Sequence, residues 1–317
     1  MTDAQLHIVT GSDDNYVPGV MVLIASAHWH NPGARFTVLD LGISAENRAR
    51  IDRLAARLDC RIDRIEISDS IFAAIPVRRA HLTRSTYLRL LIPELMPEAE
   101  RVVYMDCDMV VTGDLTPLAT MDLGAAPVAA VACPGPDKRE LAATGTQRGE
   151  YVNAGLLVMN LPVLRRDGFA ARCLELLSDP AHPLLSEDQS ALNIAYRGQM
   201  LYLPGRFNVY ANEATYPSAE DLPDQISVLH YVVSMKPWLW SVPFGEVWQF
   251  HANRIADLMP PRKRSFRHYR TRAEMYRRNA FGLALGKKKH WRRIALRRAI
   301  RQGFVADYLR AQAARAN

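Results

Sequence analysis

The stretch "VVYMDCDMVV", residues 102–111, places Asp106 and Asp108 inside a run of valines and methionines. Such apolar flanks are typical of a strand that is buried on both faces. Two neighbouring carboxylates repel each other and resist ionisation unless positive charge lies close to both. On an extended segment, side chains two residues apart point to the same face, so we expect both aspartates at one site. A hard divalent cation such as Mg²⁺, Mn²⁺ or Ca²⁺ would remove the electrostatic penalty.

This Asp-X-Asp pattern is common, and it has a plain alternative. One aspartate can be a solvated loop residue while the other caps a turn. The position in the chain favours the metal site, because the pair ends a predicted buried strand. Open α/β sheets bind ligands at the carboxyl ends of their strands.

The chain around this stretch alternates strand and helix signals, which predicts an α/β fold with a mostly parallel sheet and helices on both faces. Ser44 is expected to cap one helix, and Pro93 to end another. Strands are expected at 6–11, 35–42, 60–67, 101–106 and 127–133, and helices at 16–30, 45–58, 82–95, 162–177 and 186–198. A polar loop is expected up to about residue 149, and the apolar segments 150–161 and 226–238 complete the core.

Composition bounds the class of protein. The chain has 317 residues, of which 49% are hydrophobic, as in a globular protein with a sizeable core. No run of eighteen apolar residues predicts a membrane-spanning helix, and the N-terminus lacks a signal-peptide pattern. The four cysteines are widely spaced, which predicts reduced thiols in a cytoplasmic protein without a disulfide framework or zinc site.

The net charge of +7 hides an asymmetry along the chain. Residues 1–261 hold 22 basic and 31 acidic side chains, whereas residues 262–317 hold 18 basic and 2 acidic ones. We therefore expect a catalytic or binding domain over 1–261 and a basic, partly helical tail over 262–317, divided at Pro260–Pro261.

Six segments in order carry a resemblance to a known family. They are "DDNYV" (13–17), "STYLRL" (85–90), "VVYMDCDMVV" (102–111), "YVNAGLLVMNL" (151–161), "EDQSALN" (187–193) and "HYVVSMKPW" (230–238). Together they resemble glycosyltransferase family 8, most of all its bacterial lipopolysaccharide galactosyl- and glucosyltransferases, over about residues 5–245. The resemblance implies a GT-A nucleotide-sugar transferase fold, a UDP-sugar donor and Mn²⁺, with Mg²⁺ as the substitute.

The resemblance implies functional roles for His230 and Lys236. A lone histidine on a strand is more often structural, but an imidazole suits Mn²⁺ beside two carboxylates. The resemblance places the metal histidine at His230, with Asp106 and Asp108. Lys236 is either an exposed lysine or the cation that neutralises the leaving UDP. The family usually has glycine where Val233 stands, which affects the backbone contact to the diphosphate.

Four further residues match positions at which the family binds the donor: three match its nucleotide-binding motif, and one matches an arginine beside the donor sugar. Asp13, Asn15 and Tyr16 resemble the family's uridine-binding residues; the alternative is an ordinary helix cap. Arg89 matches the arginine that holds the donor sugar and orients Asp106; the alternative is an exposed helix arginine.

The reacting centre is expected at Asn153, Asp188 and Gln189. Asn153 could read sugar hydroxyls or merely form a turn. Asp188 resembles the residue that binds the donor hydroxyls, and Gln189 the residue nearest the anomeric carbon. The family often has a second aspartate where Ser190 stands, so neither Gln189 nor Ser190 offers a carboxylate nucleophile. We therefore expect a same-face, ion-pair-like displacement.

The resulting hypothesis is a metal-dependent, retaining hexosyltransferase. It would move galactose or glucose from UDP to a saccharide or lipid-linked saccharide in lipopolysaccharide or related glycan assembly. Two alternatives are a glycogenin-like priming transferase and a non-enzymatic lipid or nucleic-acid binder on a degenerate transferase fold.

The basic tail predicts where the protein acts. Leu296, Ile300, Phe304 and Tyr308 recur every four residues and indicate one apolar stripe on a basic helix. The stripe could pack on the body, bind an anionic membrane or accompany nucleic acid. We expect peripheral attachment to the inner face of the cytoplasmic membrane, and no nucleic acid, because the body is acidic.

Overall fold

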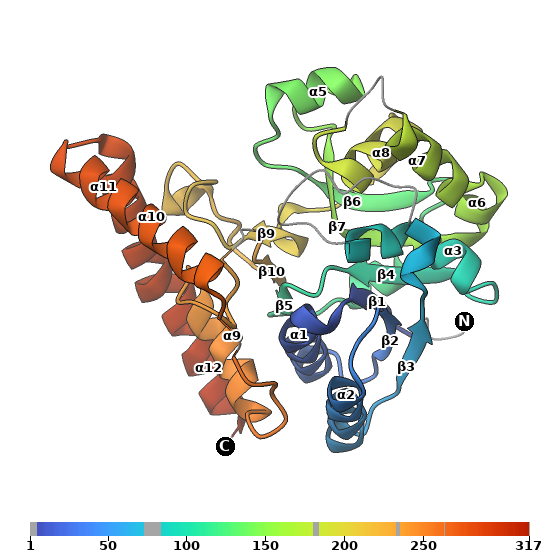
Figure 1. The fold of residues 1–317 in the computed structure, drawn as a ribbon, viewed down its shortest axis with the longest axis horizontal. Coiled ribbons are helices and arrows are strands. Elements are labelled where there is room, and N and C mark those ends of the chain that lie inside the picture. Colours follow the sequence, from blue (N-terminus) through green and yellow to red (C-terminus); the bar gives the residue numbers. More distant parts are fainter. Residues whose placement is uncertain (1–4, 73–83, 180–183, 233–234, 263, 317) are drawn as a thin grey trace.

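The computed structural model describes residues 5–316 except 73–83, 180–183, 233–234 and 263. Its centre is a seven-stranded sheet in the order β3-β2-β1-β4-β7-β6-β8 (Figure 1). Its strands are β1 (His7–Ser12), β2 (Arg35–Asp40), β3 (Ile62–Glu66), β4 (Arg101–Met105), β6 (Val128–Ala132), β7 (Val152–Asn160) and β8 (Leu201–Tyr202). Only β7 runs antiparallel to its neighbours, β4 and β6, so the predicted mixed, mostly parallel sheet is confirmed.

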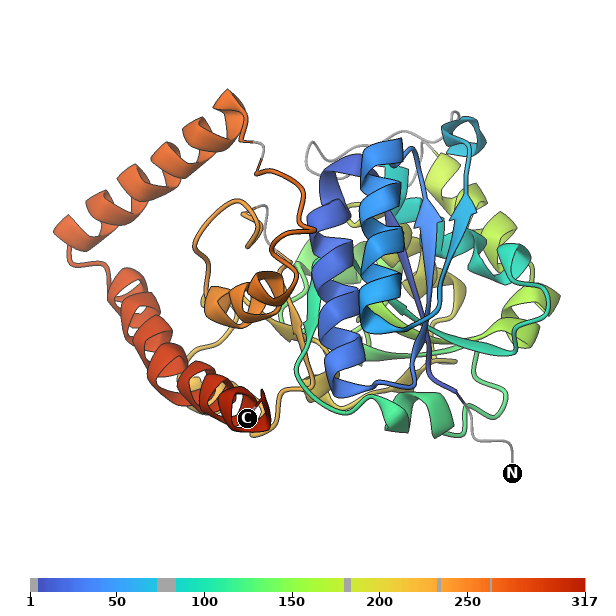
Figure 2. The same ribbon diagram turned by 90° about the horizontal axis from the view of Figure 1, so that it is seen from below.

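Helices cover both faces of this sheet, and each face has its own apolar core. One face carries α1 (Val17–His30) and α2 (Ala45–Leu58), which lie side by side in Figure 2. The other carries α6 (Leu161–Arg166), α7 (Phe169–Ser178) and α8 (Glu187–Ala195). The hydroxyl of Ser44 accepts a hydrogen bond from the backbone of Asn47, so the predicted cap of α2 is confirmed.

A small second sheet contains the last three residues of the stretch 102–111. It consists of β5 (Met109–Val111), β10 (Val228–His230) and β9 (Val209–Tyr210), in the order β5-β10-β9. The expectation that Asp106 and Asp108 stand on one extended segment is therefore wrong. The chain leaves β4 in the large sheet, turns at residues 106–108 and enters β5 in the small one.

Other predicted elements also differ. Residues 84–91 form a 3₁₀ segment, η3 (Arg84–Leu91), followed by α3 (Ile92–Leu95); Pro93 lies in the first turn of α3, where its missing N–H costs nothing. The expected loop before residue 149 contains α5 (Lys138–Thr144), and Gly168, with a φ of +61°, divides the expected helix 162–177 into two. A short helix, α4 (Thr116–Thr120), follows β5. The start of the expected segment 82–95 lies outside the described residues.

The C-terminal part forms an arm that leaves the body and returns to it. After α9 (Gly245–Arg254), the chain runs out along α10 (Phe266–Ala284) and back along α11 (Lys288–Ile300) and α12 (Ala306–Ala316) (Figure 2). Non-helical backbone at Gly303 bends the returning path. Among the described residues, no helix is both long and apolar enough to cross a membrane.

The predicted apolar stripe exists, but it faces the protein. Leu296, Ile300 and Tyr308 are buried in the same core as α1, and Phe304 packs against that core. The hydroxyl of Tyr308 lies 2.9 Å from Nε2 of His30 and 2.7 Å from Nε2 of His251. The stripe therefore serves docking of the arm onto the body. A helical period alone does not tell which apolar partner covers it.

Candidate active site

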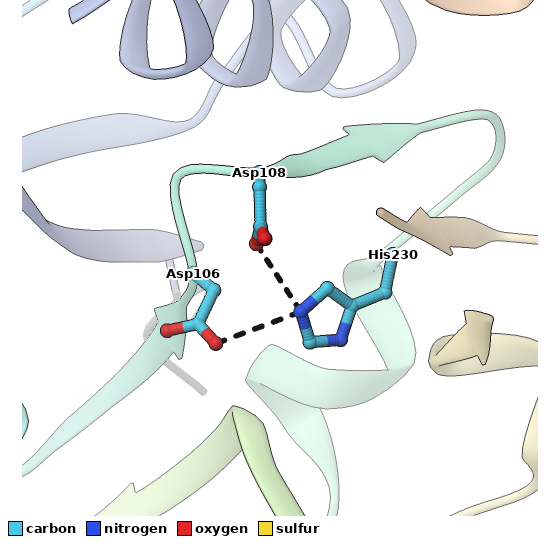
Figure 3. A group of neighbouring side chains, drawn as sticks. All are labelled: Asp106, Asp108 and His230. Carbon is cyan, nitrogen blue, oxygen red and sulfur yellow. Dashed lines mark ion pairs between the residues drawn. The ribbon is translucent and has the colours of Figure 1, made fainter. Parts of the chain in front are cut away.

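Three possible metal ligands converge from two sheets. Asp106 follows β4, Asp108 precedes β5, and His230 ends β10 (Figure 3). Nε2 of His230 lies 3.6 Å from Oδ2 of Asp106 and 3.2 Å from Oδ1 of Asp108. One ligand atom from each residue lies within 4.8 Å of the others. The turn brings the two carboxylates together as the extended segment was expected to do.

These residues fit a hard divalent cation. Oδ1 of Asp108 is buried and has no hydrogen-bond partner among the described residues, an arrangement that is costly without a cation. Gly155 leaves the space that the cluster occupies, because a Cβ there would lie 2.4 Å from Cε1 of His230 and 2.9 Å from Oδ2 of Asp106. Two carboxylates and one imidazole form a donor set that suits Mn²⁺.

Lys236 is a buried partner of this cluster and is not an exposed lysine. Its Nζ lies 2.5 Å from Oδ2 of Asp108 and also donates to the carbonyl oxygen of Tyr231 at 2.9 Å. Burial alone would raise the pKa of Asp108. Lys236 and His230 outweigh burial and hold that pKa well below its usual range.

Arg89 joins the metal cluster to Asp188. Its guanidinium is buried, with Nη2 3.0 Å from Oδ1 of Asp106 and Nε 2.8 Å from Oδ2 of Asp188. It also lies over the ring of Tyr104, whose hydroxyl donates to Asp106 at 2.8 Å. Burial raises the pKa of Asp188 to about 6, although Arg89 and a hydrogen bond from Thr86 oppose the shift.

Gln189 and Asn153 meet beside these charges. The Asn153 side chain donates from Nδ2 to Oε1 of Gln189 at 2.7 Å. The backbone N–H of Ala154 donates to the same oxygen at 3.2 Å. Asn153 is therefore part of a hydrogen-bonded side-chain network, and not merely a turn residue.

A cavity of about 1240 Å³ connects the site residues. Ten of the eleven predicted residues line it, namely Asn15, Tyr16, Arg89, Asp106, Asp108, Asn153, Asp188, Gln189, His230 and Lys236. The ring of Tyr16 packs edge-on against Trp238, with centroids 5.5 Å apart. The cavity has room for a nucleotide and a sugar together.

Asp13 is placed differently. Its carboxylate caps the 3₁₀ turn η1 (Asp14–Tyr16) by accepting from the backbone of Asn15 at 2.9 Å, and it lines a separate, smaller cavity. The neighbouring Asp14 lines the large cavity instead. The helix-cap alternative thus describes the structural position of Asp13. Val233 lies outside the described residues.

Several residues of the site had not been predicted. Thr86 donates to Asp188, Tyr104 donates to Asp106, and Asn208 lies 2.9 Å from Nδ1 of His230. Thr86 and Tyr104 lie inside two of the six segments that resemble the family, so the sequence could have pointed to them. Asn208 lies in an irregular stretch between segments, and no sequence signal marked it.

Known proteins with similar sequences include transferases. General stress protein A of Bacillus subtilis is 26% identical over 74% of this chain and 88% of that protein. The lipopolysaccharide 1,3-galactosyltransferase of Salmonella typhimurium is 27% identical over 74% of this chain and 73% of that protein. Some relatives are longer: the chain covers only 33% and 34% of two streptococcal glycosyltransferases.

Structure and family comparisons agree with the sequence relatives. The crystal structure of the galactosyltransferase LgtC, in complex with donor and acceptor sugar analogues, superposes with a TM-score of 0.71 at 27% identity. The match covers 81% of this chain and 98% of LgtC, and it supports the expected GT-A-type fold. The sequence model of "Glycosyl transferase family 8" matches residues 7–241. The chain therefore belongs to glycosyltransferase family 8.

Proposed function

We propose that the protein is a retaining hexosyltransferase that uses a UDP-sugar and Mn²⁺. The donor would be UDP-galactose or UDP-glucose, and the acceptor a saccharide or lipid-linked saccharide of lipopolysaccharide or a related glycan. The observation that carries the proposal is the partly buried cluster of Asp106, Asp108 and His230, open to a cavity large enough for a nucleotide-sugar. Related lipopolysaccharide galactosyl- and glucosyltransferases support the substrate class.

Each side chain of the site has a task in this proposal. A bound Mn²⁺ supplies positive charge at the diphosphate, which becomes more negative as it leaves. Lys236 adds a second cation there, and Tyr16 and Asn15 hold the uracil and ribose. Arg89 fixes the relative positions of Asp106 and Asp188, and the Asp188 carboxylate accepts hydrogen bonds from the donor hydroxyls.

The chemistry we propose proceeds on one face of the sugar. The bond between the anomeric carbon and the diphosphate oxygen breaks, and its electron pair leaves with UDP. The acceptor oxygen then bonds to the same face, and its proton passes to the leaving phosphate oxygen. Gln189 lies beside the anomeric carbon and offers no carboxylate. A covalent glycosyl adduct trapped on Asp188 would contradict this route.

The direct test is a panel of UDP-sugars assayed for Mn²⁺-dependent UDP release by wild type and Asp108→Asn. We expect release with UDP-galactose or UDP-glucose in wild type only. Binding of UDP without turnover of any donor would favour the non-enzymatic alternative. A glycogenin-like primer would gain hexose units on its own chain, whereas we expect the intact mass to stay unchanged.

We further propose that the arm attaches the protein to an anionic membrane surface. Residues 262–317 carry 18 basic and 2 acidic side chains, and each basic residue near such a surface contributes about 1 kcal/mol. Large apolar side chains on α10, on α11 and between them are exposed; they are Phe266, Tyr269, Tyr276, Phe281, Leu285, Trp291 and Ile294. These residues, and not the buried stripe, are the ones available to lipid.

Vesicle flotation tests the attachment. Wild type should float with anionic vesicles and stay in solution with neutral ones. Phe281→Ser combined with Trp291→Ser should weaken flotation, because both side chains are more than half exposed. Equal flotation of wild type with both kinds of vesicle, or with neither, would refute the proposal.

A further inference from the structure

A chain of hydrogen bonds runs from the buried carboxylate of Glu140 to the candidate metal ligand His230. It passes through Tyr151, Gln189, Asn153 and Asn208 in that order. Glu140 on α5 and Asn208 before β9 are 2% and 3% exposed, and nothing in the proposed chemistry uses them. Buried polar chains are costly unless every donor meets an acceptor, so the direction of each bond can be deduced.

The backbone of Gly155 sets the direction at the His230 end. Its N–H donates to Oδ1 of Asn153 at 3.1 Å, which identifies that atom as the oxygen. The same oxygen lies 2.7 Å from the Asn208 side chain, so Asn208 must present its NH₂ group there. The remaining amide atom of Asn208, its oxygen, then faces Nδ1 of His230 at 2.9 Å.

An amide oxygen only accepts hydrogen bonds, so Nδ1 of His230 must carry a proton. In the neutral imidazole, the lone pair then lies on Nε2. This is the nitrogen that faces Asp106 and Asp108. Asn208 thus prepares His230 as a ligand through Nε2, in the way that second partners of metal-binding histidines commonly do.

The backbone of Ala154 sets the direction at Gln189. Its N–H donates to Oε1 of Gln189, the same oxygen that accepts from Asn153. The NH₂ group of Gln189 is therefore turned toward the hydroxyl of Tyr151, at 3.1 Å. A flip of the Gln189 amide would place its NH₂ group against two donors.

Glu140 completes the chain. Because the Tyr151 oxygen accepts from Gln189, its own proton must go elsewhere. Oε1 of Glu140 lies 3.1 Å away and Oγ of Ser190 lies 3.0 Å away, and Ser190 itself donates to Glu140, so both routes end at Glu140. Burial raises the pKa of Tyr151, so the phenol keeps that proton. The Glu140 carboxylate also accepts from the hydroxyl of Ser190 and from the backbone N–H of Ser186. A carboxylate accepts only, so every donor in the chain points toward it.

We propose that Asn208, Tyr151 and Glu140 are positioning residues that hold the Nδ1–H tautomer of His230 and the orientation of the Gln189 amide. The tautomer is a property of the folded chain. The consequences for metal and sugar rest on the proposed function.

The tautomer is measured by ¹⁵N NMR of histidine-labelled protein in alkaline solution, without metal or donor. The His230 signals are assigned by their loss in His230→Gln. We expect a protonated Nδ1 and an unprotonated Nε2 in wild type. A proton on Nε2 in wild type would overturn the proposal, whatever the enzyme assays show.

Asn208→Ala tests the consequence for the metal, with Asn160→Ala, at the far end of β7, as the matched control. We expect Asn208→Ala to mix the tautomers and to weaken Mn²⁺ binding roughly 10- to 100-fold, measured by calorimetry. Asn160→Ala should change neither. Unchanged tautomer and affinity in a folded Asn208→Ala would refute the role of Asn208; if that variant does not fold, the wild-type tautomer decides.

The Glu140 end has its own test. Glu140→Ala should lower kcat about tenfold while the KM for the donor and the Mn²⁺ affinity change little, because Gln189 loses its orientation. Ser190 touches Glu140, so Ser190→Asp added to Glu140→Ala returns a carboxylate to the same place and should restore kcat. Unchanged kcat in Glu140→Ala, or no recovery in the double variant, would refute the role of Glu140.

If wild type transfers no sugar at all, the proposed function fails. The Glu140 end is then decided by the Gln189 side-chain amide signals. We expect them to shift in Glu140→Ala and to return toward their wild-type positions in the double variant. Signals that do not move in Glu140→Ala would refute the orienting role.

Discussion

The ammonium group of Lys236 lies 2.5 Å from a carboxylate oxygen of Asp108, and both side chains are largely buried. The contact joins the segment after β10 to the turn before β5. It compensates one of the two negative charges at the candidate metal site, while the other oxygen of Asp108 faces His230. A diphosphate bound at the metal would offer Lys236 a second partner within the same cavity.

Lys236→Met should impair catalysis more than folding. We expect kcat to fall by about two orders of magnitude, as for other groups that stabilise a leaving charge, and the donor KM to rise. The variant should lose thermal stability without metal, because Asp108 keeps a buried charge, and regain part of it with Mn²⁺. Steady-state kinetics and thermal unfolding check this, with the exposed Lys288→Met as the control. Equal kcat values for the two variants would contradict the role.

Gly155→Ala should remove metal binding while the sheet remains folded. The added Cβ would lie 2.4 Å from the His230 ring and 2.9 Å from Asp106, so the ligands must separate. Calorimetric titration with Mn²⁺ should show affinity lowered at least tenfold, whereas circular dichroism stays native. Gly124→Ala is the control. Its added Cβ would meet no atom within 4 Å, and its positive φ makes the substitution a test of backbone strain alone, at a turn away from the site. Wild-type Mn²⁺ affinity in Gly155→Ala would show that the cluster does not hold the ion.

The activity should fall at acidic pH because Asp188 becomes protonated. Burial raises its pKa to about 6, and only the ionised carboxylate accepts hydrogen bonds with both of its oxygens. We expect kcat/KM to rise with pH through about 6 in wild type, and this limb to vanish in the less active Asp188→Asn. An unchanged limb in the variant would assign it to another group.

The same pKa shift has a consequence for stability. The folded protein holds the Asp188 proton more tightly than the unfolded chain, so this contribution is present in acid and is lost as pH rises through about 6. Asp188→Asn should remove this decline in denaturant titrations. Parallel pH curves for both proteins would contradict the assignment.

Docking of the arm should weaken in acid. Burial lowers the pKa of His30 to about 4 and that of His251 to about 3, with Arg315 and Arg254 respectively adding to the shift. Unfolded histidine takes up a proton near pH 6.5, so the stability from these neutral rings is present above that pH and is lost as pH falls toward 4. The protection factors of the α12 amides, which compare observed exchange with intrinsic exchange at the same pH, should therefore fall below neutral pH.

Tyr308→Phe provides the check on that mechanism. It removes the hydroxyl that both rings contact and should cost about 1 kcal/mol at neutral pH. A His251→Phe variant should show a smaller acid effect than wild type. Protection factors of the α12 amides that do not change with pH in wild type would refute the histidine contribution.

Local signals predicted much of the fold. The bounds of α2 follow from Ser44 at its start and from the amphipathic period, both of which lie within one short segment. The two aspartates and His230 could be predicted to meet because their segments match a family pattern. The turn at residues 106–108 could not be predicted locally. It forms because the chain leaves the large sheet after β4, and β5 pairs with β10, which is more than a hundred residues away in the sequence.

The remaining differences also have non-local causes. Asp13 and Asp14 are chemically alike, and the 3₁₀ turn decides which of them faces the cavity. Asn208 lies before β9 and contacts His230 on β10, and asparagine is common in irregular segments. The stripe at Leu296 and Ile300 has a real helical period, but the period does not say whether protein or lipid covers it.

Binding of UDP measured by calorimetry, with and without Mn²⁺, tests the central claim most directly. In wild type we expect binding that requires Mn²⁺. In Asp108→Asn and in His230→Gln we expect it to weaken at least tenfold, because a residue that would hold the cation, and with it the positive charge for the diphosphate, is lost. UDP that binds wild type equally well without a divalent cation, or that binds all three proteins with one affinity, would contradict the assignment of Asp106, Asp108 and His230 as the metal site.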